Sequence, residues 1–150
     1  MEIRPATRDD LGALHAIVQR AYEPFVARIG RRPAPMDDDY RIRIDNGEVT
    51  VAVVDDTTAG VLVTVVEADS LLIENVSVDP PYQGRGIGGI LLKHAEEIAE
   101  GARVGEVRLY TNAAMVENLA MYRRLGYVEG DRRISNGFDR VFFSKGIAGD

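Results

Sequence analysis

Cysteine is absent from this sequence, and histidine is nearly so. Without cysteine the chain can form neither a disulfide framework nor a metal site built from thiolates. The two histidines, His15 and His94, stand far apart along the chain, which argues against a metal centre built from imidazoles. We therefore predict that the protein holds no metal.

Long hydrophobic runs and an excess of positive charge are also missing. No apolar stretch approaches the length that a helix needs to cross a bilayer, so we expect no membrane contact. The opening residues, MEIRPATRDD, lack the apolar segment of a secretory signal, and the expected compartment is the cytoplasm. Lys and Arg number 18 against 24 Asp and Glu, giving a formal net charge of −6. This balance argues against nucleic acid as the main partner and is compatible with a cationic substrate.

What is present is the composition of an ordinary globular protein, with 45% hydrophobic and 28% charged residues. The 150 residues are enough to bury a sizeable core. Because no repeat, low-complexity tract or linker interrupts the chain, we expect one domain over residues 1–150.

The first third of the chain reads as a strand at EIRPA followed by helices. Thr7 and Asp10 have the spacing of a capping box and predict the start of a helix. Pro24 is expected to end or bend that helix. A second helix is predicted over residues 36–47, where the acids of its first turn suit the helix dipole or, alternatively, a cationic substrate.

The rest of the chain alternates between strand and helix patterns. The predicted strands are EVTVAVVD, AGVLVTVVE, SLLIENVSV, EVRLYT, YVEG and FDRVFFSK. The predicted helices begin near Gly86 and at MVENLAMYRRL. This order predicts an α/β (α+β) fold with a mixed, mostly antiparallel sheet and helices on both faces.

Between the third of those predicted strands and the helix near Gly86 lies DPPYQGRGIGG, which holds more glycine than a plain connection requires. A strand, a glycine-rich turn and a helix N-terminus leave several main-chain N–H groups without partners, and the helix dipole adds positive charge there. Phosphate binds at such ends, and glycine allows its close approach because no Cβ intervenes. We therefore predict a phosphate-binding loop.

The spacing of the loop separates several kinds of phosphate site. No Lys-Ser/Thr pair follows the glycines, so the loop is not a P-loop. Gly84, Gly86 and Gly89 satisfy Gly-x-Gly-x-x-Gly, but that dinucleotide fingerprint should open a series of parallel βαβ units, and this loop follows an antiparallel meander. A nucleotide-binding module is kept as an alternative.

The pattern Gln83-x-x-Gly86-x-Gly88 resembles the acetyl-CoA loop of the Gcn5-related N-acetyltransferase (GNAT) superfamily. The resemblance covers nearly the whole chain and is carried, in order, by IRPAT-x-DD, IENVSVDP, GIGGILLKHAEEIAE, LYTN and ENLAMYRRLGYVE. It implies the GNAT fold, in which two central strands splay apart, and it implies acetyl-CoA as the cofactor.

The resemblance also implies the residues of the site. Main-chain N–H groups of the loop would hold the CoA pyrophosphate, the strand before it would pair with the pantetheine arm, and Tyr122 would protonate the departing thiolate. The implied cofactor-binding residues are Val76, Ser77, Val78, Gln83, Gly84, Arg85, Gly86, Ile87, Gly88, Gly89, Asn112, Asn118 and Tyr122.

The residues themselves suit acid–base chemistry. A phenol whose pKa is near ~10 can protonate a thiolate, although Tyr122 could also be a core residue of an amphipathic helix. Glu74 interrupts an apolar strand and is the candidate general base; a structural carboxylate paired with an arginine is the alternative. Strand alternation predicts that Glu74 shares a face with Val76 and Val78, with Asn75 on the other face.

The sequence thus predicts an acetyl-CoA-dependent N-acetyltransferase. We expect direct transfer in a ternary complex, because no cysteine and no activated serine is available to carry the acetyl group. The expected acceptor is the primary amine of a small molecule. The alternatives are a protein lysine or N-terminal amine, and a non-catalytic acyl-CoA sensor. Dimers are frequent among related folds, so a homodimer is compatible with the resemblance.

Overall fold

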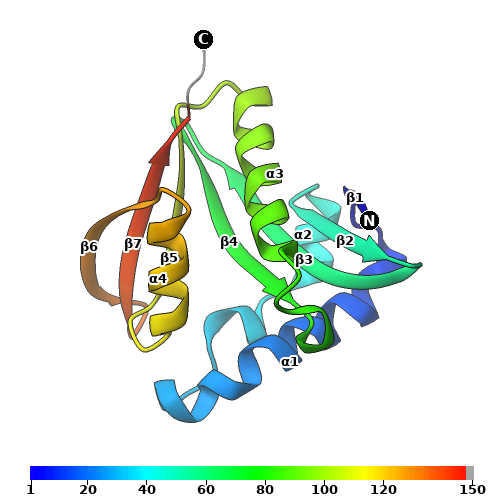
Figure 1. The fold of residues 1–150 in the computed structure, drawn as a ribbon, viewed down its shortest axis with the longest axis horizontal. Coiled ribbons are helices and arrows are strands. Elements are labelled where there is room, and N and C mark those ends of the chain that lie inside the picture. Colours follow the sequence, from blue (N-terminus) through cyan, green and yellow to red (C-terminus); the bar gives the residue numbers. More distant parts are fainter. Residues whose placement is uncertain (148–150) are drawn as a thin grey trace.

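Seven strands form one mixed sheet in the computed structural model, which describes residues 1–147 (Figure 1). Their order across the sheet is β1-β2-β3-β4-β5-β7-β6, and every neighbouring pair is antiparallel except β4 and β5. The strands are β1 (Glu2–Pro5), β2 (Val49–Val54), β3 (Thr57–Val66), β4 (Ser70–Val78), β5 (Glu106–Asn112), β6 (Val128–Ser135) and β7 (Phe138–Gly146). The predicted mixed, mostly antiparallel sheet is confirmed.

Helices cover both faces of this sheet (Figure 1). They are α1 (Leu11–Ile29), α2 (Tyr40–Asp45), α3 (Ile87–Gly101) and α4 (Val116–Arg124), with short 3-10 turns η1 (Arg8–Asp10), η2 (Ala34–Asp37) and η3 (Pro80–Tyr82). One apolar core lies between the sheet and α3 with α4, and it includes Leu62, Leu91 and Tyr122. A second core lies under α1 and α2 and includes Leu14 and Val61. Burial of these side chains is the main favourable contribution to folding.

The first helix runs further than the sequence predicts. Pro24 does not end α1, which continues to Ile29 and closes at Gly30 in the left-handed conformation (φ 88°). The last turn is held from outside, because Arg28 forms an ion pair with Glu117 of α4 at 2.7 Å. Pro24 therefore lies inside the helix, although it lacks the N–H group of a regular helical residue.

The second helix is shorter than predicted. Within the expected range 36–47, only α2 is α-helical, and its first turn is capped by Asp39, whose side chain accepts a hydrogen bond from the N–H of Ile42 (3.3 Å). The preceding residues form the separate turn η2. An N-cap residue has non-helical backbone, so the cap at Asp39 sets the start of the helix.

The aspartates before α2 all have protein partners. Besides the cap at Asp39, the carboxylates of Asp37 and Asp38 form ion pairs at 3.0 Å with Arg32 and Arg43. These acids therefore serve local structure, as the dipole interpretation of the sequence expects in part.

The central strands β4 and β5 part from one another halfway along. They pair from Ser70 with Glu106 to Ile73 with Leu109, and no pairing between them follows. The sheet therefore opens between residues 74–78 of β4 and the end of β5. The splayed central strands implied by the resemblance are confirmed.

A glycine in β3 fixes how closely α3 approaches the sheet. A Cβ added at Gly60 would lie 3.0 Å from Cδ1 of Leu91 and 3.1 Å from Cγ2 of Ile87, closer than such contacts normally come. The absence of a side chain therefore lets the first turn of α3 rest against β3. This packing places the N-terminus of α3 beside the open end of β4.

Candidate active site

The turn between β4 and α3 presents a row of free main-chain N–H groups. Within residues 1–147, the N–H groups of residues 84–89 donate to no protein acceptor; the first bond of the helix is from the N–H of Ile90 to the oxygen of Gly86 (3.1 Å). Gly84 and Gly86 both have φ of 82°, a conformation that glycine adopts at little cost. A Cβ at either position would enter open space. Free N–H groups at a helix N-terminus are the arrangement that binds anions in proteins. We call this turn the cradle.

This cradle, residues 84–89, opens onto a cleft of about 580 Å³. The cleft runs along the free edge of β4 and is bounded by α1 and α4. Most of the predicted cofactor residues line it, namely Val76, Ser77, Val78, Gln83, Gly84, Gly86, Ile87, Gly88, Gly89, Asn118 and Tyr122. Residues more than 40 positions apart in the sequence are thus brought together around one cavity.

Two predicted cofactor residues lie elsewhere. The side chain of Arg85 packs over the ring of Tyr82, 5.2 Å from its centroid, so only its main chain belongs to the cradle. Asn112 does not line the cleft: its Oδ1 accepts a hydrogen bond from the N–H of Ala114 (2.9 Å). That bond stabilises the turn leading to α4, and Asn112 lines a smaller neighbouring cavity instead.

Tyr122 lies on the wall of the cleft and is only 5% exposed. Its ring is fixed by Tyr127 and Phe143, whose centroids lie 5.8 Å and 5.7 Å away. Burial, reinforced by the neighbouring tyrosines, raises the pKa of Tyr122 well above its usual range. The phenol therefore keeps its proton over the whole working pH range and can donate a hydrogen bond to an anion in the cleft.

An ion pair that the sequence does not indicate links α1 to the segment between β4 and the cradle. Arg20 donates from Nε to Oδ1 of Asp79 (2.8 Å) and from Nη2 to Oδ2 (3.0 Å). The Asp79 side chain is 10% exposed and stands directly before the proline pair of η3. A two-point contact of this kind fixes orientation as well as distance. Because the partners are 59 residues apart, no local pattern could have revealed the pair.

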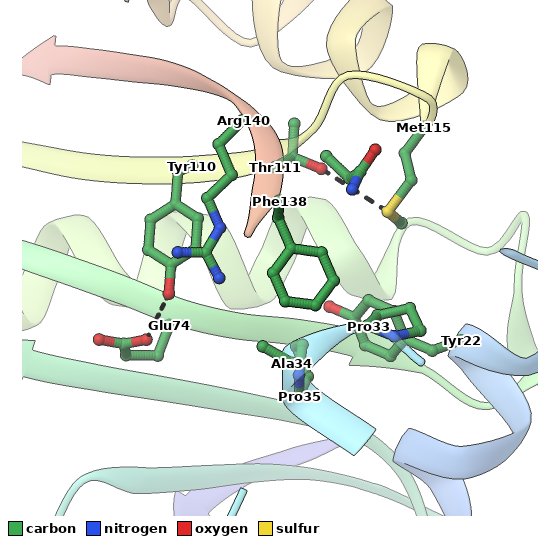
Figure 2. Close-up of a pocket in the computed structure, with 11 residues that line it drawn as sticks. Tyr22, Pro33, Ala34, Pro35, Glu74, Tyr110, Thr111, Met115, Phe138 and Arg140 are labelled. Atoms are coloured by element: carbon green, nitrogen blue, oxygen red, sulfur yellow. Dashed lines mark hydrogen bonds between the residues drawn. The ribbon is translucent and has the colours of Figure 1, made fainter. Parts of the chain in front are cut away.

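A second, smaller cavity of about 50 Å³ adjoins the cleft (Figure 2). Tyr22 and Met115 line both spaces and so form their common wall. Glu74 lies in this cavity, where its Oε2 accepts a hydrogen bond from the hydroxyl of Tyr110 (2.9 Å) and is 3.9 Å from Nη2 of Arg43. Burial and the charge of Glu74 raise the pKa of Tyr110 to about 12, so Tyr110 is the donor.

The expectation that Glu74 shares a face with Val76 and Val78 is wrong. In the pairing of β3 with β4, Val63 faces Asn75 and Thr64 faces Ile73, which leaves Glu74 as an extra residue. Such a β-bulge interrupts alternation. Glu74 consequently lies toward α1 and α2, on the same side as Asn75.

Ser77 lies on this side too, and its Oγ donates to Oδ1 of Asn75 (2.6 Å). Glu74 makes no hydrogen bond to Ser77 among residues 1–147, so the bulge brings no base to the serine hydroxyl. Its proximity to Glu74 therefore creates no activated nucleophile.

A buried chain of hydrogen bonds fixes residues 33–35, which line the smaller cavity. Tyr22 donates to Oδ1 of Asn75 (3.1 Å), Nδ2 of Asn75 donates to the hydroxyl of Tyr40 (2.9 Å), and Tyr40 donates to the oxygen of Pro35. Burial raises the pKa of Tyr22 to about 12, so this hydroxyl stays protonated. The chain ties residues 33–35 over the cavity, a role that sequence patterns do not indicate for these residues.

Across residues 1–147, no three side chains of the types that bind metals gather closely enough to hold an ion. In the same range no helix combines the length and the apolar character required to cross a bilayer.

Comparison with known proteins gives a family match. The model of the Acetyltransferase (GNAT) family matches residues 13–127. The [ribosomal protein bS18]-alanine N-acetyltransferase of Salmonella typhimurium is 34% identical over 79 residues, which cover 53% of this chain and 53% of that protein. The N-alpha-acetyltransferase RimI of Mycobacterium tuberculosis is 45% identical over 56 residues, covering 37% and 33%. The chain spans about half the length of the first of these relatives and a third of the second.

Solved structures show the same fold. The PaiA N-acetyltransferase of Thermoplasma acidophilum, solved with coenzyme A, superposes with a TM-score of 0.80 at 20% identity and covers 97% of this chain and 98% of that one. The ribosomal-protein-S18-alanine N-acetyltransferase of Escherichia coli has a TM-score of 0.73 at 24% identity, covering 99% and 95%. The seven-stranded sheet and its helices are therefore shared along nearly the full length.

Proposed function

Because the chain belongs to the acetyltransferase (GNAT) family, we propose that it is an N-acetyltransferase that moves an acetyl group from acetyl-CoA to a primary amine. The observation that carries the proposal is the cradle of free N–H groups at residues 84–89, which opens onto a long cleft with a buried tyrosine on its wall. We further propose that residues 1–150 act as one domain.

The cleft fits the parts of coenzyme A. The cradle would hold the pyrophosphate, because it offers several N–H donors at the positive end of α3. Beyond Ile73 the edge of β4 that faces β5 is unpaired, and residues 76–78 would pair with the amides of the pantetheine arm as an added strand does. When bound, acetyl-CoA supplies the activated acetyl thioester.

Two side chains would handle the protons. Tyr122, protonated in the cleft, would donate to the sulfur of the departing thiolate. Glu74 would accept the proton of the amine, whose loss at pH 7 costs about 4–5 kcal/mol for an ammonium of pKa near 10.4. Its Oε2 is held by Tyr110, while Oε1 has no partner among residues 1–147 and is free to accept that proton.

We propose that the transfer is direct. The chain has no cysteine to carry the acetyl group, and the hydroxyl of Ser77 is engaged by Asn75 instead of a base. The acceptor we propose is a small molecule, because the cavity that residues 33–35 and Glu74 line together has a volume of only about 50 Å³.

A protein N-terminus is the second candidate acceptor. It is favoured by the name of the Salmonella typhimurium relative, which specifies a ribosomal protein as the substrate. Peptide and free amine must therefore be compared side by side.

The test combines binding and turnover. Calorimetry with coenzyme A, NAD and ATP is followed by thiol release from acetyl-CoA against amino acids, polyamines, aminoglycosides and peptides. We expect coenzyme A alone among the three ligands to bind, and a small amine to release thiol. Binding of coenzyme A without any thiol release would identify a sensor, and binding of NAD or ATP instead would identify a nucleotide module. Faster release with peptides than with small amines would establish the second candidate.

A further inference from the structure

One buried charge in the smaller cavity has no counter-charge. Arg140 of β7 is 6% exposed, and among residues 1–147 its guanidinium has no carboxylate within ion-pair distance and makes one hydrogen bond, from Nη1 to Oγ of Ser135 (3.3 Å). Its neighbours in the same hairpin, Arg132 and Arg133, both pair with aspartates. A buried charge normally needs a partner, and a guanidinium carries several N–H donors. Most of the N–H groups of Arg140 therefore have no hydrogen-bond acceptor among residues 1–147.

The guanidinium is nevertheless held firmly in place. Its central carbon lies 4.2 Å from the ring centroid of Tyr110 and 5.2 Å from that of Phe138, and Figure 2 shows it between the two rings. Contacts with ring faces stabilise the cation without using its N–H groups. Because those groups point along the guanidinium plane, they stay available to an acceptor in the cavity that Arg140 lines.

The negative charge in the cavity is the carboxylate of Glu74, which is hydrogen-bonded to Tyr110, the tyrosine that Arg140 covers. Glu74 accepts a hydrogen bond from the hydroxyl of Tyr110, and Arg140 covers the ring of the same residue, so a carboxylate and a guanidinium both contact one tyrosine. They do not pair with each other: Glu74 is within ion-pair distance only of Arg43 among the described residues. One small cavity thus offers an anion and a cation to whatever enters it.

We propose that Arg140 binds a carboxylate of the acceptor, which makes the acceptor a small amine that also carries a carboxylate, such as a free amino acid. This inference rests on the proposed function. Arginine binds a carboxylate with two parallel N–H···O bonds, while the amine would lie toward Glu74. The cavity of about 50 Å³ has room for roughly three or four water-sized groups, which matches a carboxylate and the carbon that bears it. A peptide N-terminus carries an amide in that position, whose single carbonyl oxygen has no charge, so it can neither accept both N–H···O bonds nor neutralise the guanidinium.

The test uses matched amines that differ in one group: an amino acid, its primary amide and its decarboxylated amine. For the wild-type protein we expect kcat/KM to be roughly 10²-fold higher for the amino acid than for the amide, because a buried donor left unpaired opposes the analogue. Arg140→Gln should remove that preference, mainly by raising KM for the acid. Arg133→Gln, an equal loss of charge on the neighbouring strand, should keep the preference.

A binding readout covers the case in which Arg140→Gln fails to fold. Calorimetry on the wild-type protein loaded with coenzyme A should detect the desamino analogue of the amino acid, a carboxylate without an amine, and should not detect the corresponding amide. Arg140→Lys, which keeps the charge but loses the planar fork, should weaken that binding at least 10-fold.

The outcomes separate the two proposals. Equal rates for acid and amide, or equal rates for an amino acid and a peptide with the same first residue, would overturn the carboxylate site and leave acetyl transfer standing. Absence of thiol release with every amine would overturn the proposed function. Binding of the desamino acid in an otherwise inactive protein would still support the role of Arg140, and failure to bind it would overturn that role.

Discussion

Glu74 and Asn75 are neighbours in the chain, yet both side chains lie on the face of the sheet that is covered by α1 and α2. Glu74 accepts a hydrogen bond from Tyr110 in the smaller cavity. Asn75 accepts one from Tyr22 and donates one to Tyr40 beside that cavity. The bulge that causes this arrangement occurs directly after the last pairing of β4 with β5. The opening of the sheet and the placement of the candidate base are therefore one local feature of β4.

If Glu74 removes the amine proton, Glu74→Gln should lower kcat/KM by roughly 10²–10⁴ near pH 7. The deficit should shrink as the pH approaches the pKa of the amine, because the free amine then needs no base. The measurement is the pH dependence of thiol release for both proteins.

A matched control distinguishes this role from a structural one. Glu48 is the other glutamate that contacts Arg43, at 3.2 Å, so Glu48→Gln disturbs the same arginine without touching the cavity. We expect the control to keep the wild-type profile. A deficit of Glu74→Gln that stays constant with pH, or one that Glu48→Gln reproduces, would mean that Glu74 only pairs with Arg43.

Tyr122→Phe should reduce turnover by roughly 10²–10³-fold and leave the affinity for coenzyme A nearly unchanged, because the change removes a proton donor but keeps the ring. Tyr127→Phe is the matched control. Tyr127 packs edge-on against Tyr122, and its hydroxyl is buried without a hydrogen-bond partner among the described residues. Its removal should leave turnover intact and be neutral or stabilising in thermal unfolding. Comparable losses in both variants would assign the effect to packing.

The features that the sequence predicts well are local ones. The glycine spacing of residues 83–88, the strand before it and the helix after it are all contiguous, and the structure assembles them as a cradle at a helix N-terminus. The order of strands and helices was also recoverable because each element carries its own periodicity.

The features that the sequence does not reveal depend on contacts between residues that are distant along the chain. Alternation failed at Glu74 because a bulge depends on the register with β3. The expectation of a helix end at Pro24 failed because α1 continues to Ile29, which the local sequence around the proline does not indicate. The sequence gives no sign of the Arg20–Asp79 pair or of Arg140, because an arginine in a strand pattern does not reveal whether it will be buried without a carboxylate.

Gly86→Ala tests the cradle by its backbone. Alanine at a φ of 82° is strained by about 1–2 kcal/mol, and relief of that strain would turn the N–H groups out of alignment. We expect at least a 10-fold weaker affinity for coenzyme A by calorimetry. Gly101→Ala, in the last turn of the same helix, has open space and no such strain, and it should leave affinity unchanged while slightly raising the melting temperature. Equal affinities for Gly86→Ala and the wild-type protein would remove the cradle from cofactor binding.

The stability of the protein in acid should depend on Asp10, which lies at the start of α1. Its carboxylate accepts hydrogen bonds from both Nη atoms of Arg4 (2.8 and 2.9 Å) and from the N–H of Thr7 (2.7 Å). The bond from Arg4, and then that from Thr7, lower the pKa of Asp10 below its ordinary value despite burial. A carboxyl with a lowered pKa in the folded state stabilises the fold fully above its unfolded pKa, near ~3.9, and loses that contribution as the pH falls through the folded value.

Asp10→Asn should therefore lower the free energy of unfolding by about 1–3 kcal/mol at pH 7 and by much less in strong acid, where the wild-type carboxyl is protonated too. Urea unfolding at a series of pH values measures the difference between the two proteins. Asp9→Asn, at the exposed neighbouring position, should follow the wild-type curve. A difference that stays constant from pH 7 to pH 2 would contradict the ionic role of Asp10. A difference that closes in acid would establish that the ionised carboxylate of Asp10 stabilises the start of α1, the helix that carries Arg20 and Tyr22 of the cleft.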